Sequence, residues 1–256
     1  MIFLAAGTQD GRQIAQLLLQ NGYEVTASVV SGYGKVLLSG HQKLTVIEQM
    51  LDEKAMQKIL QDINAKIFID ASHPYAVNIS QTAMRVCRQL GIYYLRYERP
   101  AISLPDYEKL YKTNSFEAAA KKAFELGRNV FLTTGSRHLT EFTAQIKSPE
   151  QTLTVRVLPA VESIQACINK GILLKHVIAM QGPFSKELNK SMYEHTKAEV
   201  VVMKNSGSLG GSDTKLSAAI EAGIFVVVIG RPPLEYDNII TDSRLLIDKI
   251  KKVGEK

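Results

Sequence analysis

Cysteine is scarce in this sequence, which has only Cys87 and Cys167 among its 256 residues. The two lie far apart in apolar stretches of helical periodicity, and their spacing excludes a small fold held together by disulfides. We expect both to be buried hydrophobic residues in a reducing compartment. The five histidines are scattered and distant from the cysteines, so no metal site is predicted.

Long apolar runs and dense basic blocks are also missing. No run approaches the roughly 18 residues that cross a bilayer, and no basic region precedes the first apolar residues. We therefore expect a cytoplasmic protein with neither a membrane span nor a signal peptide. The net charge of +6 weakly favours anionic ligands. No zinc-finger spacing, RNP-like strand or Lys/Arg block points to a nucleic-acid partner, and none is expected.

What the sequence does contain is an alternation of short apolar runs with amphipathic stretches. The expected strands are 2–5, 23–30, 44–47, 66–70, 92–95, 129–133, 153–158, 176–180, 199–203 and 225–229. The expected helices are 8–19, 52–61, 74–90, 115–126, 137–146, 161–169, 185–195, 213–222 and 243–253. Strands that are apolar on both faces are typical of a parallel sheet covered on both sides. We predict an α/β fold of two Rossmann-like domains, 1–100 and 101–256, with mainly parallel sheets and an inter-domain cleft, because the two prolines of residues 99–106 interrupt the alternation.

The loop after the first strand, residues 7–12, is the strongest candidate for a phosphate site. Ligands of such sheets bind beyond the carboxyl ends of the strands, where this loop lies. We expect Gly7 to allow a tight turn and Gly11 to allow close packing of helix and strand. Free N–H groups at the start of the helix favour an anion. The loop is not a full G-x-G-x-x-G, so a plain strand–helix turn is equally open. The cofactor-binding candidates here are Gly7, Thr8, Gln9, Asp10 and Gly11.

The end of the second strand bears on the choice of a dinucleotide. NAD-binding folds usually place an acid there to bind the ribose hydroxyls, and this strand has none. Lys35 could reach a 2′-phosphate, and Ser28 and Ser31 could donate to it. The pattern favours NADPH, with NADH possible. The domain 1–100 is accordingly predicted to bind a nicotinamide cofactor.

Residues 70–75 (DASHPY) form the most unusual loop. Pro74 is expected to begin a helix, which would place Ser72 and His73 near free backbone donors at its start. Both are candidates for cofactor binding. His73 could bind an anionic group, position the nicotinamide or donate a proton, although a histidine at a helix start is more often a structural cap.

The second half repeats small, polar and basic residues after its strands, and the domain 101–256 is expected to contribute substrate binding. Arginine suits carboxylates, because its fork is bidentate. An extended linker is an equally simple explanation of the glycine-rich residues 204–211. The substrate-binding candidates are Thr134, Gly135, Ser136, Arg137, Gln181, Gly182, Lys204, Asn205, Ser206 and Arg231.

Several stretches together resemble the precorrin-6A reductase family (CobK/CbiJ type). They run in the family's order over nearly the whole chain: LAAGTQDGR, IDASHPYA, LRYERP, FLTTGS, RVLP, AMQGPFS, KNSGSLGGSDTKLSAA and VVVIGRPP. The departures are mild. Ala6 stands where the family commonly has a glycine, and Ser72 and Tyr75 stand where it commonly has Thr and Phe.

The resemblance implies reduction of one C=C bond (C18–C19) of a corrin precursor by hydride from NAD(P)H, in cobalamin (vitamin B12) synthesis. The substrate is a macrocycle with many carboxylates, either metal-free or holding cobalt. This accounts for basic residues expected near the cleft: Arg96, Arg99, Arg137, Lys204 and Arg231. Candidates for the proton donor are His73, Tyr75 or a bound water. We expect a monomer or a small homo-oligomer.

Other functions compete with this interpretation. A short-chain reductase would show a Tyr-x-x-x-Lys pair, and the one match, Tyr193 with Lys197, follows a helix of the second domain. A non-catalytic two-domain nucleotide- or solute-binding protein would bind without turnover. A tetrapyrrole methyltransferase would bind S-adenosylmethionine instead of a reduced nicotinamide.

Overall fold

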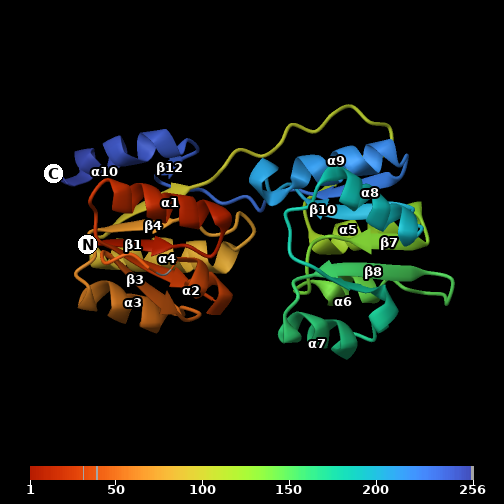
Figure 1. Cartoon of the computed structure of the whole chain (residues 1–256), viewed down its shortest axis with the longest axis horizontal. Coiled ribbons are helices and arrows are strands. Elements are labelled where there is room, and N and C mark those ends of the chain that lie inside the picture. Colours follow the sequence, from red (N-terminus) through yellow and green to blue (C-terminus); the bar gives the residue numbers. More distant parts are fainter. Residues whose placement is uncertain (31, 39, 255–256) are drawn as a thin grey trace. The chain divides into compact units, whose positions relative to one another are not determined.

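The chain forms two compact units in the computed structural model, which describes residues 1–30, 32–38 and 40–254. Unit 1 comprises Met1–Pro100 and Pro233–Lys256, and unit 2 comprises Ala101–Pro232 (Figure 1). Each unit has a six-stranded sheet in which all paired strands are parallel. The predicted α/β fold with two parallel sheets is confirmed. The expected inter-domain cleft stays a prediction.

Unit 1 has the strand order β12-β5-β4-β1-β2-β3. Its elements are β1 (Ile2–Ala5), α1 (Gln9–Gln20), β2 (Val25–Val29), α2 (Gly32–Leu38), β3 (Leu44–Glu48), α3 (Glu53–Asp62), β4 (Ile67–Asp70), α4 (Val77–Leu90), β5 (Tyr93–Tyr97), β12 (Ile239–Ile240), the 3-10 helix η3 (Ser243–Leu245) and α10 (Leu246–Gly254).

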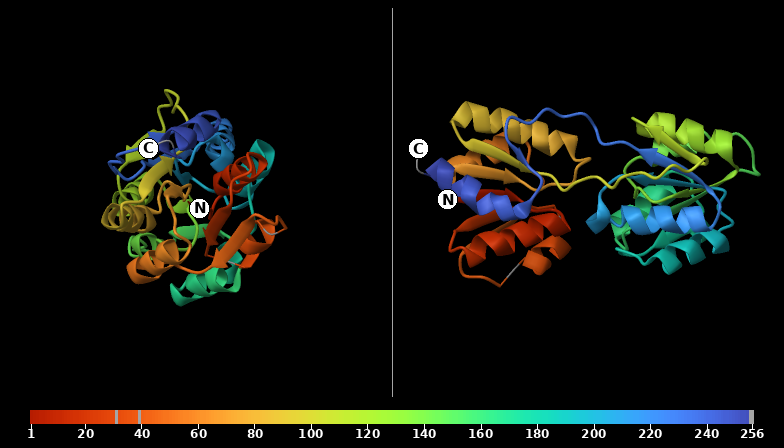
Figure 2. Two further views of the ribbon diagram at one scale, coloured as in Figure 1. Left: turned by 90° about the vertical axis from the view of Figure 1, so that its left-hand side faces the viewer. Right: turned by 90° about the horizontal axis from the view of Figure 1, so that it is seen from above.

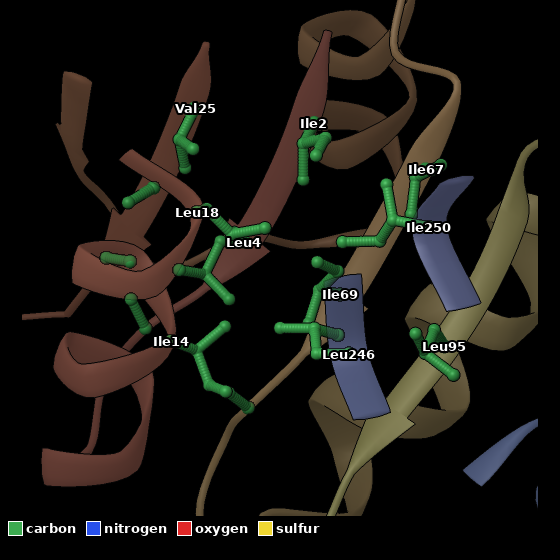
Figure 3. Packing of buried hydrophobic residues seen from close by; sticks show 14 of the residues in the cluster. Ile2, Leu4, Ile14, Leu18, Val25, Ile67, Ile69, Leu95, Leu246 and Ile250 are labelled. Atoms are coloured by element: carbon green, nitrogen blue, oxygen red, sulfur yellow. The ribbon is translucent and has the colours of Figure 1, made fainter. Parts of the chain in front are cut away.

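The sheet of unit 1 is buried on both faces because side chains alternate along each strand. Ile2 and Leu4 of β1 pack with α1 and α10, and Phe3 packs with α3 and α4 on the opposite face. Figure 3 shows Leu246 and Ile250 of α10 beside the side chains of β4 in the first of these clusters. Burying such a side chain contributes roughly 1.5–3 kcal/mol.

The C-terminal segment therefore belongs to unit 1, and the expected second domain 101–256 is corrected at that end. Strand β12 pairs with β5, with Ile239 opposite Arg96. Helix α10, dark blue in Figure 2, lies beside α1, and both pack into one hydrophobic cluster. The physical reason is the buried face of α10, because Leu246 and Ile250 would be exposed without the sheet of unit 1.

Unit 2 has the strand order β6-β11-β10-β7-β8-β9. Helices α8 and α9 cover one face of this sheet, and α5 packs against β10 and β11. Its elements are β6 (Leu110–Thr113), α5 (Phe116–Leu126), β7 (Asn129–Leu132), α6 (Leu139–Thr143), β8 (Thr152–Val157), α7 (Val161–Asn169), η1 (Leu174–His176), β9 (Val177–Ala179), α8 (Lys186–His195), β10 (Val200–Lys204), η2 (Ser208–Gly210), α9 (Ser212–Glu221) and β11 (Phe225–Ile229).

Two edge strands were not expected from the sequence. Strand β12 fills the edge beside β5, and β6 fills the corresponding edge beside β11. Both are short and carry no continuous apolar run, so the pattern that revealed the other strands does not reveal them. Each pairs with a strand that is distant in sequence: β6 with β11, and β12 with β5.

Three local expectations near candidate residues are corrected. Residues 32–38, where no element was expected between the predicted strands 23–30 and 44–47, form α2. The helix expected from Pro74 begins at Val77, because residues 73–76 form a turn in which the Ala76 N–H donates to the His73 carbonyl at 2.8 Å. Helix α6 begins at Leu139, so Arg137 lies in the preceding loop.

No helix in the described ranges is both long and apolar enough to cross a membrane.

Candidate functional site

The switch point of unit 1 lies between β1 and β4. The chain continues from β1 toward β2 and from β4 toward β5, so the loops after the two strands diverge there, where ligands of such sheets bind. Thr8 joins the two loops. Its Oγ1 donates to the Ala71 carbonyl at 2.9 Å and accepts from the Gly11 N–H at 3.0 Å, which caps α1. The predicted phosphate loop is thus held at the switch point.

The two glycines of this loop differ. A Cβ on Gly11 would lie 2.5 Å from the Ala6 Cα, so the expected close packing of helix and strand is confirmed. Gly7 does not have a positive φ, and nothing lies within 4 Å of an added Cβ. The expected tight turn at Gly7 is therefore corrected, since another residue could adopt its backbone. What Gly7 provides is open space at the start of α1, which fits a phosphate group.

Asp10, predicted to bind cofactor, is buried and forms an ion pair with Arg99. Its Oδ1 is buried with no hydrogen-bond partner among the described residues. Arg99 was expected to meet substrate carboxylates, but its charge is matched by Asp10 inside unit 1. The pair fixes the first turn of α1 to the segment after β5. Gln9, by contrast, is only partly buried.

A buried network holds residues 70–75. The Arg96 Nη1 donates to the Asp70 Oδ1 at 2.9 Å, and neither side chain is more than 1% exposed. Ser80 and Tyr94 donate to the Asp70 Oδ2 at 2.6 and 2.7 Å. Arg96 also contacts Glu98 at 3.0 Å. Arg96 is thus neutralised by acids of its own unit, which corrects its expected role at the substrate.

These contacts decide the charge of Asp70. Burial opposes ionisation, but Arg96 and the donors Ser72, Ser80 and Tyr94 outweigh it and lower the pKa of Asp70. An ionised Asp70 then accepts from the Ser72 N–H at 2.9 Å, and the Ser72 Oγ accepts from Arg96 at 3.1 Å. Ser72 is therefore bound into the network that shapes the loop.

His73 and Tyr75, the catalytic candidates, lie in the turn that this network supports. The Tyr75 N–H donates to the His73 Nδ1 at 3.2 Å, so the neutral ring carries its proton on Nε2. The two rings are tilted, with centroids 5.6 Å apart. Both side chains are partly exposed. Their contact with a ligand stays a prediction.

An acid missed in the sequence stands next to the end of β2. Glu48, the last residue of β3, is in register with Val29, and its Oε2 lies 4.0 Å from the Lys35 Nζ. Lys35 and Glu48 are both well exposed. Ser28 is buried within the sheet, and the predicted residue Ser31 lies outside the described residues. The strand pairing could have been found only from the order β1-β2-β3, because Glu48 is distant from β2 in sequence.

The switch point of unit 2 lies between β7 and β10, by the same reasoning. Lys204 ends β10, and its Nζ donates across this point to the Thr134 carbonyl at 3.3 Å. The Phe116 ring centroid lies 5.2 Å from the same Nζ. Burial and then the nearby charge of Arg137 lower the pKa of Lys204 to about 8. Three predicted substrate-binding residues, Lys204, Thr134 and Arg137, are thus brought together.

The other substrate-binding candidates fall into two groups. Asn205 and Ser206 are buried and structural: Asn205 exchanges two hydrogen bonds with the Ile102 backbone, at 3.0 and 2.9 Å. Arg231 donates from Nε to the Asn205 carbonyl at 3.1 Å. The exposed or partly exposed candidates at the carboxyl edge are Thr134, Gly135, Ser136, Arg137, Gln181 and Gly182.

Apolar residues at the same edge of unit 2 were missed. Leu158 follows β8, Val161 begins α7 and Met180 follows β9, and their exposed fractions are 60%, 79% and 42%. Exposed hydrophobic side chains at the carboxyl edge of a sheet can form an apolar surface for a ligand. A single exposed apolar residue is common and tells little. The sequence pattern did not show that these three lie at the same edge of the sheet.

A buried arginine in unit 2 was also missed. Arg156 of β8 is 5% exposed, and its Nη1 donates to the Asn189 Oδ1 at 2.7 Å. The Phe184 ring covers its guanidinium at 4.2 Å. No ion pair of Arg156 occurs among the described residues, and burial lowers its pKa.

The two cysteines and the possible metal ligands lie as follows. Cys87 and Cys167 are buried, as expected, and burial raises the pKa of Cys87 to about 12. Within the described ranges, no group of three or more His, Cys, Asp or Glu side chains is placed to hold a metal ion.

The chain is similar to known proteins over nearly its whole length. A family model described as "Precorrin-6x reductase CbiJ/CobK" matches residues 1–251. The chain belongs to this family. Members named cobalt-precorrin-6A reductase include one from Priestia megaterium, 35% identical over 93% of both chains, and one from Salmonella typhimurium, 36% identical over 95% of this chain and 92% of the relative. The precorrin-6A reductase of Mycobacterium tuberculosis is 26% identical over 94% of this chain and 93% of its own length.

The fold of the chain also matches a solved structure. "CobK precorrin-6A reductase" has a TM-score of 0.79 and 22% identity, and the match covers 99% of this chain and 96% of the other. The resemblance drawn from the motifs, the enzyme class and the place in cobalamin biosynthesis are confirmed. A nicotinamide cofactor and a corrin precursor follow from the family. The comparisons do not support a methyltransferase or a non-catalytic binding protein.

Proposed function

We propose that this chain reduces the C18–C19 bond of cobalt-precorrin-6A with a reduced nicotinamide. Family membership supports the reaction, and the names of relatives at 35% and 36% identity support the cobalt-containing ring. The metal-free name occurs at 26% identity. Cobalt would arrive with the substrate.

One observation carries the proposal. In each unit a hydrogen bond joins the two chain segments that diverge at the switch point, and the residues there suit the nicotinamide cofactor in unit 1 and the carboxylate-rich ring in unit 2. In unit 1 the joined loops contain open space at Gly7 beside the start of α1, which fits a dinucleotide phosphate. In unit 2 they contain Lys204 and lie beside the exposed Arg137, which fits carboxylates.

The cofactor is proposed to bind unit 1 through Gly7, Thr8, Gln9 and Gly11. Of the earlier candidates, Asp10 and Ser72 shape these loops through Arg99 and the Asp70 network. The cofactor supplies hydride when bound. His73 is proposed to position the nicotinamide, because Tyr75 holds its ring by Nδ1 and leaves the proton on Nε2.

The choice of NADPH depends on Lys35, which is proposed to contact the 2′-phosphate. Glu48 lies 4.0 Å from Lys35 and reduces the net positive charge at that place. The expected preference for NADPH is therefore modest, and NADH is expected to bind as well.

Unit 2 is proposed to bind the macrocycle by two kinds of contact. Arg137 and Lys204 would meet its carboxylates, and Leu158, Val161 and Met180 would contact the apolar ring. The combination of cations and exposed apolar side chains at one edge matches a large ring that carries many carboxylates.

The test compares NADPH, NADH and S-adenosylmethionine by thermal shift and titration, followed by an anaerobic assay with cobalt-precorrin-6A. A bound ligand at 100 times its Kd stabilises the protein by about 2.7 kcal/mol. We expect stabilisation by the reduced nicotinamides alone, and oxidation of the nicotinamide only when the ring is present. Stabilisation by S-adenosylmethionine, or no oxidation with the ring, contradicts the proposal.

A further inference from the structure

Lys204 has a position that a carboxylate contact alone does not explain. It is the last residue of the central strand β10, and its ammonium reaches across the switch point to the loop that follows β7. Ligands in folds of this type bind at the diverging loops. The ammonium is therefore placed where the reacting part of a ligand lies, rather than at the rim where exposed Arg137 lies.

The surroundings of this ammonium suit proton transfer. The Phe116 ring lies 5.2 Å away, and the Lys204 side chain is partly buried. The Thr134 Oγ1, on the loop to which Lys204 donates, is buried with no hydrogen-bond partner among the described residues. An ammonium that is partly withdrawn from water can transfer a proton to a ligand bound at this switch point.

The reaction of the proposed function requires one hydride and one proton. We propose that the Lys204 ammonium is the general acid that protonates the ring carbon adjacent to the carbon that receives hydride. Hydride forms the first C–H bond, and the π electron pair of the C=C bond moves to the neighbouring carbon. That pair takes a proton from Nζ and forms the second C–H bond. Lys204 is left as a neutral amine and regains a proton from water.

The acidity of Lys204 supports this role. An ordinary lysine has a pKa of about 10.4 and releases its proton reluctantly at neutral pH. Burial, and then Arg137, lower the pKa of Lys204 to about 8. Because the ammonium is the active form, it predominates below that pKa, and its fraction falls as the pH rises through about 8. General acids work best when their pKa lies close to the working pH.

The experiment uses the full chain and compares Lys204→Met, Lys204→Arg and the wild type. Lys122→Met is the matched control, because Lys122 is an exposed lysine of α5 that pairs with Glu125. Single-turnover rates and KM are measured with cobalt-precorrin-6A and a reduced nicotinamide from pH 6 to about 9.5, a range that brackets the acid and basic limbs. Nicotinamide Kd is measured separately.

We expect Lys204→Met to lower the rate by about 10²–10⁴-fold with little change in nicotinamide Kd, and to lose the decline in rate near pH 8. Lys204→Arg keeps the positive charge, but an arginine does not release its proton, so its rate stays low while KM recovers. Lys122→Met should behave as the wild type does. Removal of a partly buried charge should not lower the melting temperature of Lys204→Met, which keeps the rate comparison valid.

Other results overturn the assignment. A wild-type rate in Lys204→Met, or a rate restored by Lys204→Arg, shows that Lys204 is not the acid. Loss of the alkaline limb in His73→Gln, with the limb intact in Lys204→Met, assigns the proton to His73. If the wild type does not oxidise nicotinamide with the ring, the proposed function itself fails.

A readout independent of turnover completes the test. Competitive labelling of amines with acetic anhydride, followed by mass spectrometry, gives the pKa of Lys204 in the resting protein. We expect a value near 8 for Lys204 and a raised value for the control residue Lys122, which pairs with Glu125. An ordinary value at Lys204 overturns the proposal even if Lys204→Met is inactive.

Discussion

Strands β1 to β5 of unit 1 and β7 to β11 of unit 2 follow the same order in their sheets, yet the two units surround their buried arginines with different partners. Arg96 in unit 1 pairs with Asp70 and Glu98, and Arg99 pairs with Asp10. In unit 2, Arg156 meets the neutral Asn189 and the Phe184 ring. The pKa of Arg96 is raised, because the acids outweigh burial, whereas burial lowers that of Arg156.

The difference shows two uses of positive charge in one fold. The buried arginines of unit 1 are compensated by acids of the same unit and fix the loops of the proposed dinucleotide site. In unit 2, Lys204 and Arg137 lie near enough for the charge of Arg137 to lower the pKa of Lys204, and two such cations favour an anionic ligand at this edge. From the sequence, the same position near the cleft was expected for all five basic residues: Arg96, Arg99, Arg137, Lys204 and Arg231.

The largest expected effect compares Arg96→Met with Arg156→Met. Arg96→Met should lower the free energy of unfolding by about 3–5 kcal/mol, because it leaves the Asp70 carboxylate buried without its cation. Arg156→Met should cost about 1 kcal/mol or less, since the lost hydrogen bond to Asn189 is offset by the removed desolvation cost. Urea unfolding at pH 7 measures both. Equal losses would show that the pairing of charges does not distinguish the units.

The pH dependence of Asp70→Asn sharpens this result. Asp70 has a lowered pKa in the fold, so its stabilisation is complete above its unfolded pKa of about 3.9 and is lost as the pH falls through the lower folded value. The gap in stability between wild type and Asp70→Asn should therefore narrow below about pH 4. A constant gap would mean that ionised Asp70 does not stabilise the fold.

The next effect separates packing from binding within unit 1. Gly11→Ala should cost about 1–3 kcal/mol in unfolding free energy, because its Cβ collides with Ala6. Gly7→Val should leave stability almost unchanged and weaken nicotinamide binding, since its side chain fills open space at the start of α1. Thermal unfolding and nicotinamide titration measure the pair. Unchanged binding in Gly7→Val would remove this loop from the cofactor site.

A smaller effect is expected in unit 2 from Arg137→Ala. Loss of a charge-assisted hydrogen bond costs about 1.5–3 kcal/mol, which corresponds to a rise of roughly 10–100-fold in KM for the ring. Nicotinamide Kd should change little. Steady-state kinetics and titration separate the two quantities. A larger effect on nicotinamide than on the ring would move Arg137 to the cofactor site.

The smallest effect concerns Lys35 and Glu48. Lys35→Glu should weaken NADPH more than NADH, because it places a second acid near the proposed 2′-phosphate. Glu48→Gln is the matched variant, and it should strengthen NADPH several-fold by removing the acid 4.0 Å from Lys35. Titration of each variant with both nucleotides gives the ratio of Kd values. An unchanged ratio in both variants contradicts a 2′-phosphate contact.

Parts of the candidate site could be found from sequence because they depend on neighbours along the chain. Thr8 caps α1 and Gly11 packs on Ala6, as the loop after the first strand suggested. The loop that carries His73 was also found. Its local geometry was misjudged, because Pro74 was taken for a helix start and the turn closed by His73 and Ala76 delays the helix to Val77.

Other parts required contacts between distant segments. Asp10 was predicted to bind the cofactor, and the fold places Arg99 against it. Asn205 looked like a substrate contact until the fold placed the Ile102 backbone against its amide. In both cases a polar residue, one in the first turn of α1 and one after β10, bonds to a distant segment of its own unit, and sequence shows the residue type but not its partner.

The sequence by itself determined the alternation of strands and helices, the parallel sheets and the family, because apolar periodicity and ordered motifs are properties of the chain in one dimension. Only the tertiary structure decided which charges are compensated, that β12 and α10 return to unit 1, and that Lys204 crosses the switch point to Thr134. These depend on pairing across long sequence separations, where the burial of a face or the neutralisation of a charge selects the partner.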